Sequence, residues 1–158
     1  MPPLLLFDPN QYDLTRVVLT REQIYEALPH RHEFMLLDGV VMIDTQVGRM
    51  IAFADIRQDA WWTAGHIPGR PLLPAVLMIE MAAHAAAYYT RTHFGCSEFL
   101  AFTALDDCTF RGTVEPPCRL YLLGTSVDLR PRRSTCTFQG LVDDKMVFQA
   151  KLTGIPIG

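Results

Sequence analysis

The stretch "AGHIPGRPLLPAVLMIEMAAHAAAYY", residues 64–89, predicts a rigid loop followed by a long apolar helix. Its first part holds three prolines and two glycines, which favour a loop of defined path. Pro74 suits the first position of a helix, because its missing N–H would have no partner there. The residues from Ala75 to Tyr89 are mostly apolar on every side, so this helix must be enclosed by other parts of the chain.

Strand-like segments lie on both sides of this predicted helix. Residues 34–44 and 48–56 are rich in Val, Ile, Met and Phe and are separated by a polar turn, which predicts a hairpin. The helix is expected to end before Gly95, and "VDDK" (142–145) predicts a hairpin turn near the end of the chain. The segments after the helix with strand composition are 99–105, 108–114, 118–129, 134–142 and 146–154.

A short amphipathic helix is expected before the first hairpin. Thr20 and Gln23 have the spacing of a capping box, and Pro29 ends the helix that they begin. Arg31 follows within "PHRH", residues 29–32. We interpret "PHR" as structural, because it would fix the exit of the helix and the start of the next strand, and a role in substrate binding is the alternative.

These patterns predict an α+β fold, in which a curved antiparallel sheet of about five to seven strands wraps around the long apolar helix. The chain is expected to form one domain over residues 1–158, with residues 1–12 as a loose N-terminal arm. In the last strand, the alternate residues from Met146 to Leu152 are expected to share one face.

Composition argues against several classes of protein. The chain is 49% hydrophobic and 20% charged with a net charge of −3, which is typical of a globular domain and does not favour nucleic-acid binding. Its four cysteines lack the spacing of a zinc site or a disulfide framework. The apolar run of residues 75–89 is shorter than the roughly 20 residues of a membrane span. We therefore expect a cytoplasmic protein without a membrane span.

Two side chains near the predicted helix are candidates for acid and base chemistry. Glu80 lies within the apolar run, and burial would raise the pKa of its carboxyl and let it act as an acid. His66 lies in the rigid loop, where an imidazole could act as a base near neutral pH. The free amides that begin at Ala75 could hold a polarised carbonyl oxygen. The alternatives are that Glu80 reaches solvent or hydrogen-bonds a neighbouring strand, and that His66 is ordinary surface.

Glu80 and His84 are four residues apart, which places them side by side on a helix and favours a hydrogen bond between them. A metal site is the alternative. The remaining histidines, His30, His32 and His93, add no ligand set with zinc spacing, so we expect no metal.

The segments "LPHRHEFMLLDGVV" and "GHIPGRPLLPAVLMIEMAAHAAA" resemble two motifs of the (3R)-hydroxyacyl-[acyl-carrier-protein] dehydratases of the FabZ type. The downstream segment "FLAFTALDDCTFRGTVEPPCRL" is similar to a strand of the same family, and the resemblance is colinear from about Leu19 to Thr153. It implies the hot-dog fold, which agrees with the sheet and helix that the patterns predict. Glutamate at position 80 resembles the FabZ type, whereas the related FabA type has aspartate there.

The resemblance implies a hydro-lyase that dehydrates a 3-hydroxyacyl thioester to a trans-2-enoyl thioester with no metal or redox cofactor. His66 matches the family's catalytic base and Glu80 its catalytic acid, and the two meet across a dimer interface in that family. The implied substrate-binding residues are Gly65, Ala75, Val76 and His84.

Two positions depart from the family's pattern. Ala75 stands where the family has glycine, and His84 stands where it has glutamine. A protonated His84 would hold Glu80 ionised and weaken it as a proton donor. A hot-dog thioesterase, in which Glu80 activates water, and a non-catalytic acyl-thioester-binding subunit remain the alternatives.

The implied partners are an acyl carrier protein that carries the substrate and a second copy of the chain. The sequence leaves open whether such dimers assemble further into a hexamer, a trimer of dimers. Acyl carrier proteins are acidic, so the basic residues Arg70, Arg130, Arg132 and Arg133 are candidates for docking one. Four residues are candidates either for an acyl tunnel or for plain core: Met78, Ile79, Met81 and Phe102.

Overall fold

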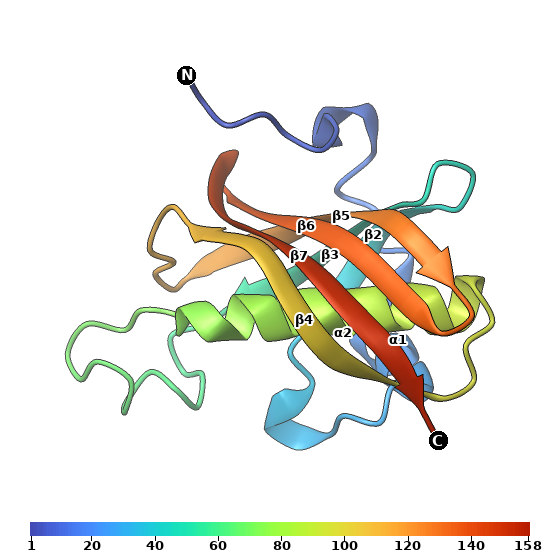
Figure 1. Ribbon diagram of the computed structural model, residues 1–158. Coiled ribbons are helices and arrows are strands. Elements are labelled where there is room, and N and C mark those ends of the chain that lie inside the picture. Colours follow the sequence, from blue (N-terminus) through green and yellow to red (C-terminus); the bar gives the residue numbers. More distant parts are fainter.

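A curved sheet of seven strands surrounds the helix α2 (Ala75–His93) in the computed structural model, which describes residues 1–158 (Figure 1). Every strand pair is antiparallel, in the order β1-β2-β3-β5-β6-β7-β4. The strands are β1 (Leu19–Thr20), β2 (Gly39–Asp44), β3 (Arg49–Ile56), β4 (Phe99–Phe110), β5 (Cys118–Arg130), β6 (Arg133–Val142) and β7 (Lys145–Ile157). The other helices are η1 (Pro9–Gln11), α1 (Arg21–Ala27) and η2 (His32–Phe34). The predicted α+β fold is confirmed.

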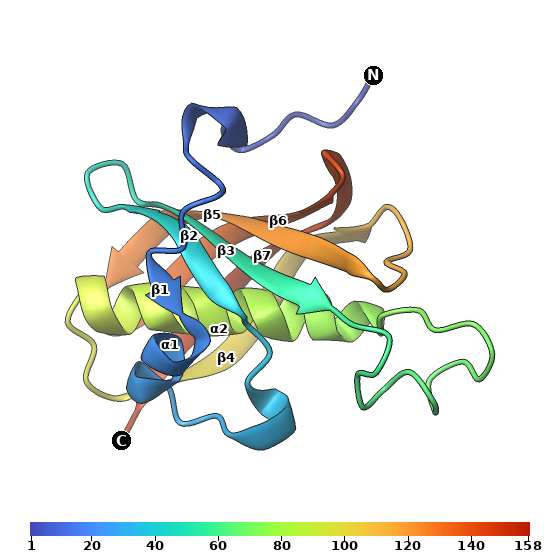
Figure 2. The ribbon, with the colours of Figure 1, turned by 180° about the vertical axis from the view of Figure 1, so that it is seen from behind.

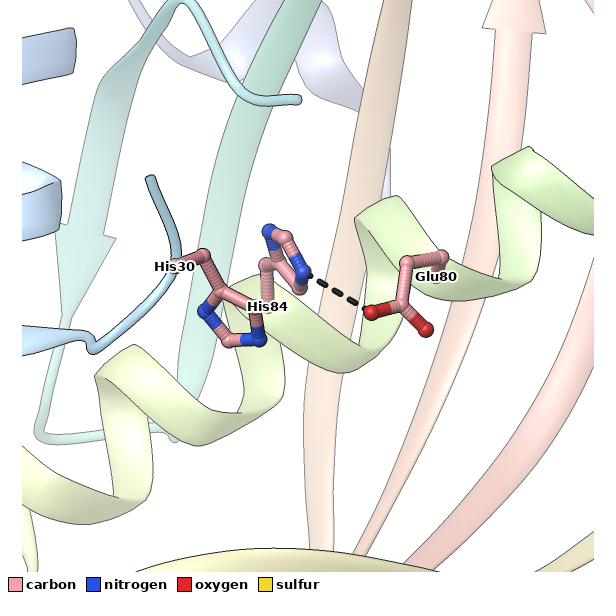
Figure 3. A group of neighbouring side chains, drawn as sticks. All are labelled: His30, Glu80 and His84. Atoms are coloured by element: carbon pink, nitrogen blue, oxygen red, sulfur yellow. Dashed lines mark hydrogen bonds and ion pairs between the residues drawn. The ribbon is translucent and has the colours of Figure 1, made fainter. Parts of the chain in front are cut away.

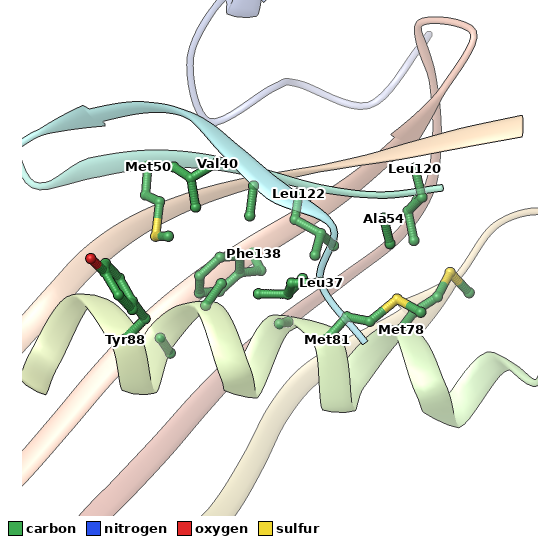
Figure 4. Packing of buried hydrophobic residues seen from close by; sticks show 14 of the residues in the cluster. Leu37, Val40, Met50, Ala54, Met78, Met81, Tyr88, Leu120, Leu122 and Phe138 are labelled. Atoms are coloured by element: carbon green, nitrogen blue, oxygen red, sulfur yellow. The ribbon is translucent and has the colours of Figure 1, made fainter. Parts of the chain in front are cut away.

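The main core lies between α2 and the concave face of the sheet (Figure 4). Met78, Met81 and Tyr88 of α2 are buried there against Leu122 and Phe138 of the sheet. Burial of the apolar side chains of α2 removes their surface from water, and this stabilises the packing of the sheet around the helix. The enclosure is incomplete, since Val76 in the first turn is 68% exposed. No helix in the structure is both long enough and apolar enough to cross a membrane.

The predicted capping box is present at the start of α1. The side-chain oxygen of Thr20 accepts a hydrogen bond from the backbone N–H of Gln23, and the Gln23 side chain accepts one from Thr20 N–H at 2.9 Å. The helix buries Ile24 and Tyr25 and ends before Pro29, as the sequence predicts. This short helix therefore brings Tyr25 against α2.

Two bulges change the strand pattern that we expected. Segments 99–105 and 108–114 are not separate strands, because β4 continues to Phe110 through an irregularity at residues 106–109. In β7, Met146 pairs with Leu141 and Phe148 with Gly140, so Val147 is an extra residue. The bulge places Met146 in a cluster apart from the core that holds Phe148, and the expected common face is wrong at this position.

The predicted turn between β6 and β7 is confirmed. Asp143 and Asp144 both have positive φ values, 48° and 61°, which is the backbone of a two-residue hairpin turn that follows the twist of the strands. The hairpin between β2 and β3 is also present.

Part of the N-terminal segment, which we expected to form a loose arm, packs on the convex face of the sheet, whereas residues 1–4 are exposed (Figure 2). Phe7 is 6% exposed and belongs to a cluster with Ile51 and Leu123. Gln139 of β6 holds the segment, since its side chain accepts from Leu6 N–H at 2.8 Å and donates to the carbonyl of Leu4 at 3.1 Å. The sheet therefore has a second, smaller core on its outer side.

Strand β4 forms one edge of the sheet and pairs only with β7. Most of its residues are exposed, and four large apolar side chains are among them: Phe99, Phe102, Leu105 and Phe110. An apolar edge strand with an unpaired row of backbone groups favours association with another strand.

Candidate active site

His66 lies in the loop between β3 and α2, which extends beyond the N-terminal end of the helix (Figure 1). Trp62 is buried and anchors the start of this loop, and the N–H of His66 donates to the Trp62 carbonyl at 2.9 Å. The His66 ring is exposed, and its Nδ1 lies 2.9 Å from the carbonyl oxygen of Leu72. A carbonyl can only accept, so Nδ1 carries a proton and Nε2 is left free for proton transfer.

Glu80 lies on the second turn of α2 and lines a cavity of about 80 Å³ between this helix and β4. Its side chain is 38% exposed, so the carboxylate faces the cavity. The other walls come from residues 28–30, the C-terminal half of α2 and the segment before β4. Phe102 also lines the cavity, whereas Met78 and Met81 lie in the main core.

His84 connects Glu80 to the interior of the protein. Its Nε2 lies 3.0 Å from Oε1 of Glu80, which confirms the hydrogen bond that the spacing predicts. Its Nδ1 lies 2.8 Å from the hydroxyl oxygen of Tyr25, and that oxygen accepts the backbone N–H of Leu37 at 2.9 Å. The His84 side chain is 1% exposed, so these hydrogen bonds replace its contact with water.

His30 is the third polar residue of this site (Figure 3). Its ring stacks on that of His84, with centroids 3.8 Å apart and planes inclined by 30°. Burial lowers the pKa of His30, and the neighbouring His84 lowers it further. His30 is therefore a neutral imidazole at neutral pH.

The carboxyl of Glu80 is ionised in this arrangement. The hydrogen bond from His84 holds the pKa of Glu80 below its ordinary value, and its partial burial acts in the opposite direction with a smaller effect. The net direction differs from our expectation, because the hydrogen bond from His84 outweighs the effect of burial on the pKa of Glu80.

The structure brings together three residues that could bind a metal: His30, Glu80 and His84 have ligand atoms within 4.8 Å of one another. Sequence spacing gave no sign of this group, because His30 comes from a different element. Both ring nitrogens of His84 are already used in hydrogen bonds, to Tyr25 and to Glu80. In the observed arrangement His84 therefore has no free lone pair with which to bind a metal ion.

Of the remaining predicted residues, Ala75 and Val76 form the first turn of α2, and Gly65 lies in the loop before it. Pro74 is the N-cap, one position before the helix, and provides no side-chain cap. The amides of Ala75 and Val76 therefore begin a helix with an uncapped N-terminus, as an oxyanion site requires. The N–H of Gly65 is used within the loop, where it donates to the Trp62 carbonyl at 3.3 Å.

The structure does not bring His66 and Glu80 of one chain together. His66 is absent from the cavity that Glu80 lines, and its ring bonds only to Leu72 in its own loop. Glu80 and His84 do meet, and the residues that sequence reasoning missed as part of the site are Tyr25 and His30. The structural role predicted for Arg31 is confirmed, because its Nη1 donates to the carbonyls of Tyr25, Leu28 and His30.

The sheet wrapped around a central helix is the hot-dog fold. A crystal structure of a putative thioesterase from Silicibacter is similar to the chain with a TM-score of 0.65 and 11% identity, and the match covers 90% of this chain and 95% of that chain. At this identity the likeness shows the fold alone.

A family model described as the FabA-like domain matches residues 28–151, and the chain belongs to this family. Within it, the chain is similar to 3-hydroxyacyl-[acyl-carrier-protein] dehydratases named FabZ. The enzyme from Novosphingobium aromaticivorans is 32% identical over 139 residues, which cover 84% of this chain and 85% of the relative. The enzyme from Mannheimia succiniciproducens is 33% identical over 140 residues, which cover 85% and 91%.

Proposed function

We propose that this chain dehydrates 3-hydroxyacyl thioesters, carried on an acyl carrier protein, to trans-2-enoyl thioesters in fatty-acid or related synthesis. The similarity to the FabZ enzymes over most of both chains supports this reaction. The observation that carries the proposal is that α2 holds both the uncapped N-terminus, with its free amides, and Glu80, whose carboxyl group lines a cavity farther along the same helix.

The reaction needs one base and one acid. The amides of Ala75 and Val76 would bind the thioester carbonyl oxygen and thereby acidify the proton on C2. The free Nε2 of His66 would remove that proton. Glu80 would protonate the departing C3 hydroxyl, so that water leaves and the C2–C3 double bond forms.

The acid role requires that Glu80 gain a proton before the reaction. In the free chain the His84 hydrogen bond lowers the pKa of Glu80. A substrate that fills the cavity would remove water from the carboxylate, and this desolvation raises the pKa. Substrate binding and protonation of Glu80 would therefore be coupled.

A second copy of the chain would complete the site. His66 and Glu80 lie apart within one chain, and the exposed β4 edge provides an apolar surface for pairing with the same strand of a partner. The loop of one protomer would then supply His66 to the Glu80 of the other. Gly65 would position this histidine, and His84 would hold Glu80.

The carrier protein would dock on basic residues at the surface. Arg130 and Arg133 share the carboxylate of Asp128, and Arg70 lies 3.7 Å from Glu115. Arg132 forms no ion pair, which makes it the strongest of the four candidates for an acidic partner.

The test is turnover of a 3-hydroxybutyryl thioester on carrier protein, with the product identified by mass. We expect loss of water and formation of the crotonyl thioester, and no reaction with the variant His66→Ala. A His66→Ala variant as active as the parent would exclude this mechanism.

One observation favours an acyl thioesterase as the second candidate. An ionised Glu80 could activate a water molecule for attack on the thioester carbonyl. Release of free thiol, measured in the same reaction, separates hydrolysis from dehydration.

A further inference from the structure

The hydrogen bonds around Tyr25 determine which nitrogen of His84 carries a proton. The hydroxyl oxygen of Tyr25 accepts the backbone N–H of Leu37, so its own proton is left to be donated. Nδ1 of His84, 2.8 Å away, is the acceptor for this proton. His84 is then protonated on Nε2, which donates to Oε1 of Glu80.

The opposite tautomer would leave a buried donor without a partner. If Nδ1 of His84 carried the proton, the Tyr25 oxygen would accept two N–H groups and its O–H would have no acceptor. An unsatisfied buried donor costs about 1–3 kcal/mol. The buried position of both side chains, at 2% and 1% exposure, prevents water from filling this role.

Tyr25 is a fixed donor rather than a source of protons. Burial raises the pKa of Tyr25, so loss of its proton to His84 is disfavoured. The hydrogen bonds from Tyr25 to His84 and from His84 to Glu80 therefore fix the orientation of the His84 ring and keep the Glu80 carboxylate ionised. They do not relay a proton to the substrate.

We propose that Tyr25 and His84 are positioning residues, in which Tyr25 fixes the Nε2–H tautomer of His84 and His84 holds the Glu80 carboxylate toward the cavity as a hydrogen-bond acceptor. This inference rests on the proposed function for its catalytic consequence, although the tautomer and the charge of Glu80 can be measured without any reaction. His84 would then set the pH above which Glu80 ceases to act as an acid.

The other charged or titratable groups near Glu80 are few. From α2 they are His84 and Arg91, and from the loop after α1 it is His30. Cys96 and Glu98 line the cavity from the segment before β4, and β4 itself contributes only apolar side chains to it. Among these, His84 and then His30 act on Glu80.

Two substitutions at position 84 separate the hydrogen bond to Glu80 from the rest of the His84 side chain. His84→Gln restores the residue of the FabZ pattern and keeps an N–H donor for Glu80. His84→Leu removes both the donor and the ionisable ring. Tyr25→Phe leaves His84 in place and removes only the hydrogen-bond donor to its Nδ1.

Nuclear magnetic resonance of the folded chain tests the inference directly. The nitrogen-15 shifts of His84 are expected to show a protonated Nε2 and an unprotonated Nδ1. The carbon-13 shift of the Glu80 carboxyl is expected to titrate at a higher pH in His84→Leu than in the wild type, with His84→Gln between them. In Tyr25→Phe the nitrogen-15 shift of Nδ1 is expected to change, because this nitrogen loses its hydrogen-bond donor, while the Glu80 carboxylate still accepts from Nε2–H.

A protonated Nδ1 in the wild type would overturn the inference, as would an unchanged Glu80 titration in both His84 variants. His84→Gln keeps the test decisive if His84→Leu fails to fold. The alkaline limb of kcat/KM for dehydration should move to higher pH in His84→Leu. Absence of dehydratase activity in the wild type would refute the proposed function. It would not affect the inference from the His84 nitrogen-15 shifts and the Glu80 carbon-13 titration.

Discussion

Nε2 of His84 lies 3.0 Å from Oε1 of Glu80, and the His84 side chain is 1% exposed whereas the Glu80 side chain is 38% exposed. The histidine is held inside the protein, while the carboxylate that it binds faces the cavity. This contrast explains why a carboxyl on an apolar helix is ionised rather than neutral. The hydrogen-bond donor is rigid and dehydrated, and the acceptor retains part of its hydration.

Mixed dimers should test whether the site is shared between chains. The variants His66→Ala and Glu80→Gln should each lose dehydratase activity by about 10²–10⁴-fold, because each lacks one partner in proton transfer. When the two are unfolded together and refolded, a hybrid dimer contains one site with both residues intact. Random pairing then restores about a quarter of the wild-type activity.

A site made within one chain would behave differently. Every chain in the mixture carries one damaged residue, so no activity would return. Each variant refolded alone is the control.

The stability of the fold should depend on pH through Glu80. Its pKa in the folded chain is lower than in the unfolded chain, so the ionised group stabilises the folded state above about pH 4.3. This stabilisation is lost as the pH falls through the lower, folded value. Urea unfolding should therefore show a stability gap between wild type and Glu80→Gln at pH 7 that narrows in acid. A gap that stays constant down to pH 3 would contradict the assigned direction.

Gly140 should not tolerate a side chain. A Cβ at this position would lie 2.4 Å from Cδ1 of the buried Phe148 ring, and Leu120 is also close at 3.2 Å. We expect Gly140→Ala to lower the free energy of unfolding by about 1–3 kcal/mol, because the surrounding core must shift. Gly112→Ala is the matched control, since its Cβ would meet only Val147 at 3.6 Å. Equal stability of the two variants would argue against this packing.

Phe7 should contribute to stability despite its position near the N-terminus. It is 6% exposed, and the Arg49 guanidinium lies 4.9 Å from the centre of its ring. Phe7→Ala is expected to cost about 3 kcal/mol in thermal or urea unfolding. Leu4→Ala should have almost no effect, because Leu4 is 91% exposed. Similar small effects of both changes would indicate that the segment does not pack in solution.

Local patterns predicted most of the fold. The capping box of Thr20, the apolar run of α2 and the turn at Asp143 and Asp144 depend on residues close in sequence, and the structure confirms all three. The bulge at Val147 was missed, because one extra residue on a strand leaves no mark in composition. The packing of Phe7 was missed for a related reason, since the outer face of the sheet exists only after folding.

The same distinction applies to the site. The pairing of Glu80 with His84 follows from helical spacing, and the sequence predicted it. Tyr25 is 59 residues from His84, and no local pattern joins them. The meeting of His30 with His84 also depends on the tertiary fold. The ionisation of Glu80 depends on these contacts, so residue type and hydropathy alone gave the wrong direction.

The two outer strands of the sheet are unequal in length. β1 has only two residues and leads directly into α1, whereas β4 has twelve. A strand from another molecule can therefore add along β4 but finds almost no backbone to bind at the opposite side. Growth of the sheet by repeated addition is blocked at one end. Pairing of β4 with another β4 covers the only long free edge strand, so this mode of association stops at two molecules instead of continuing into a fibre.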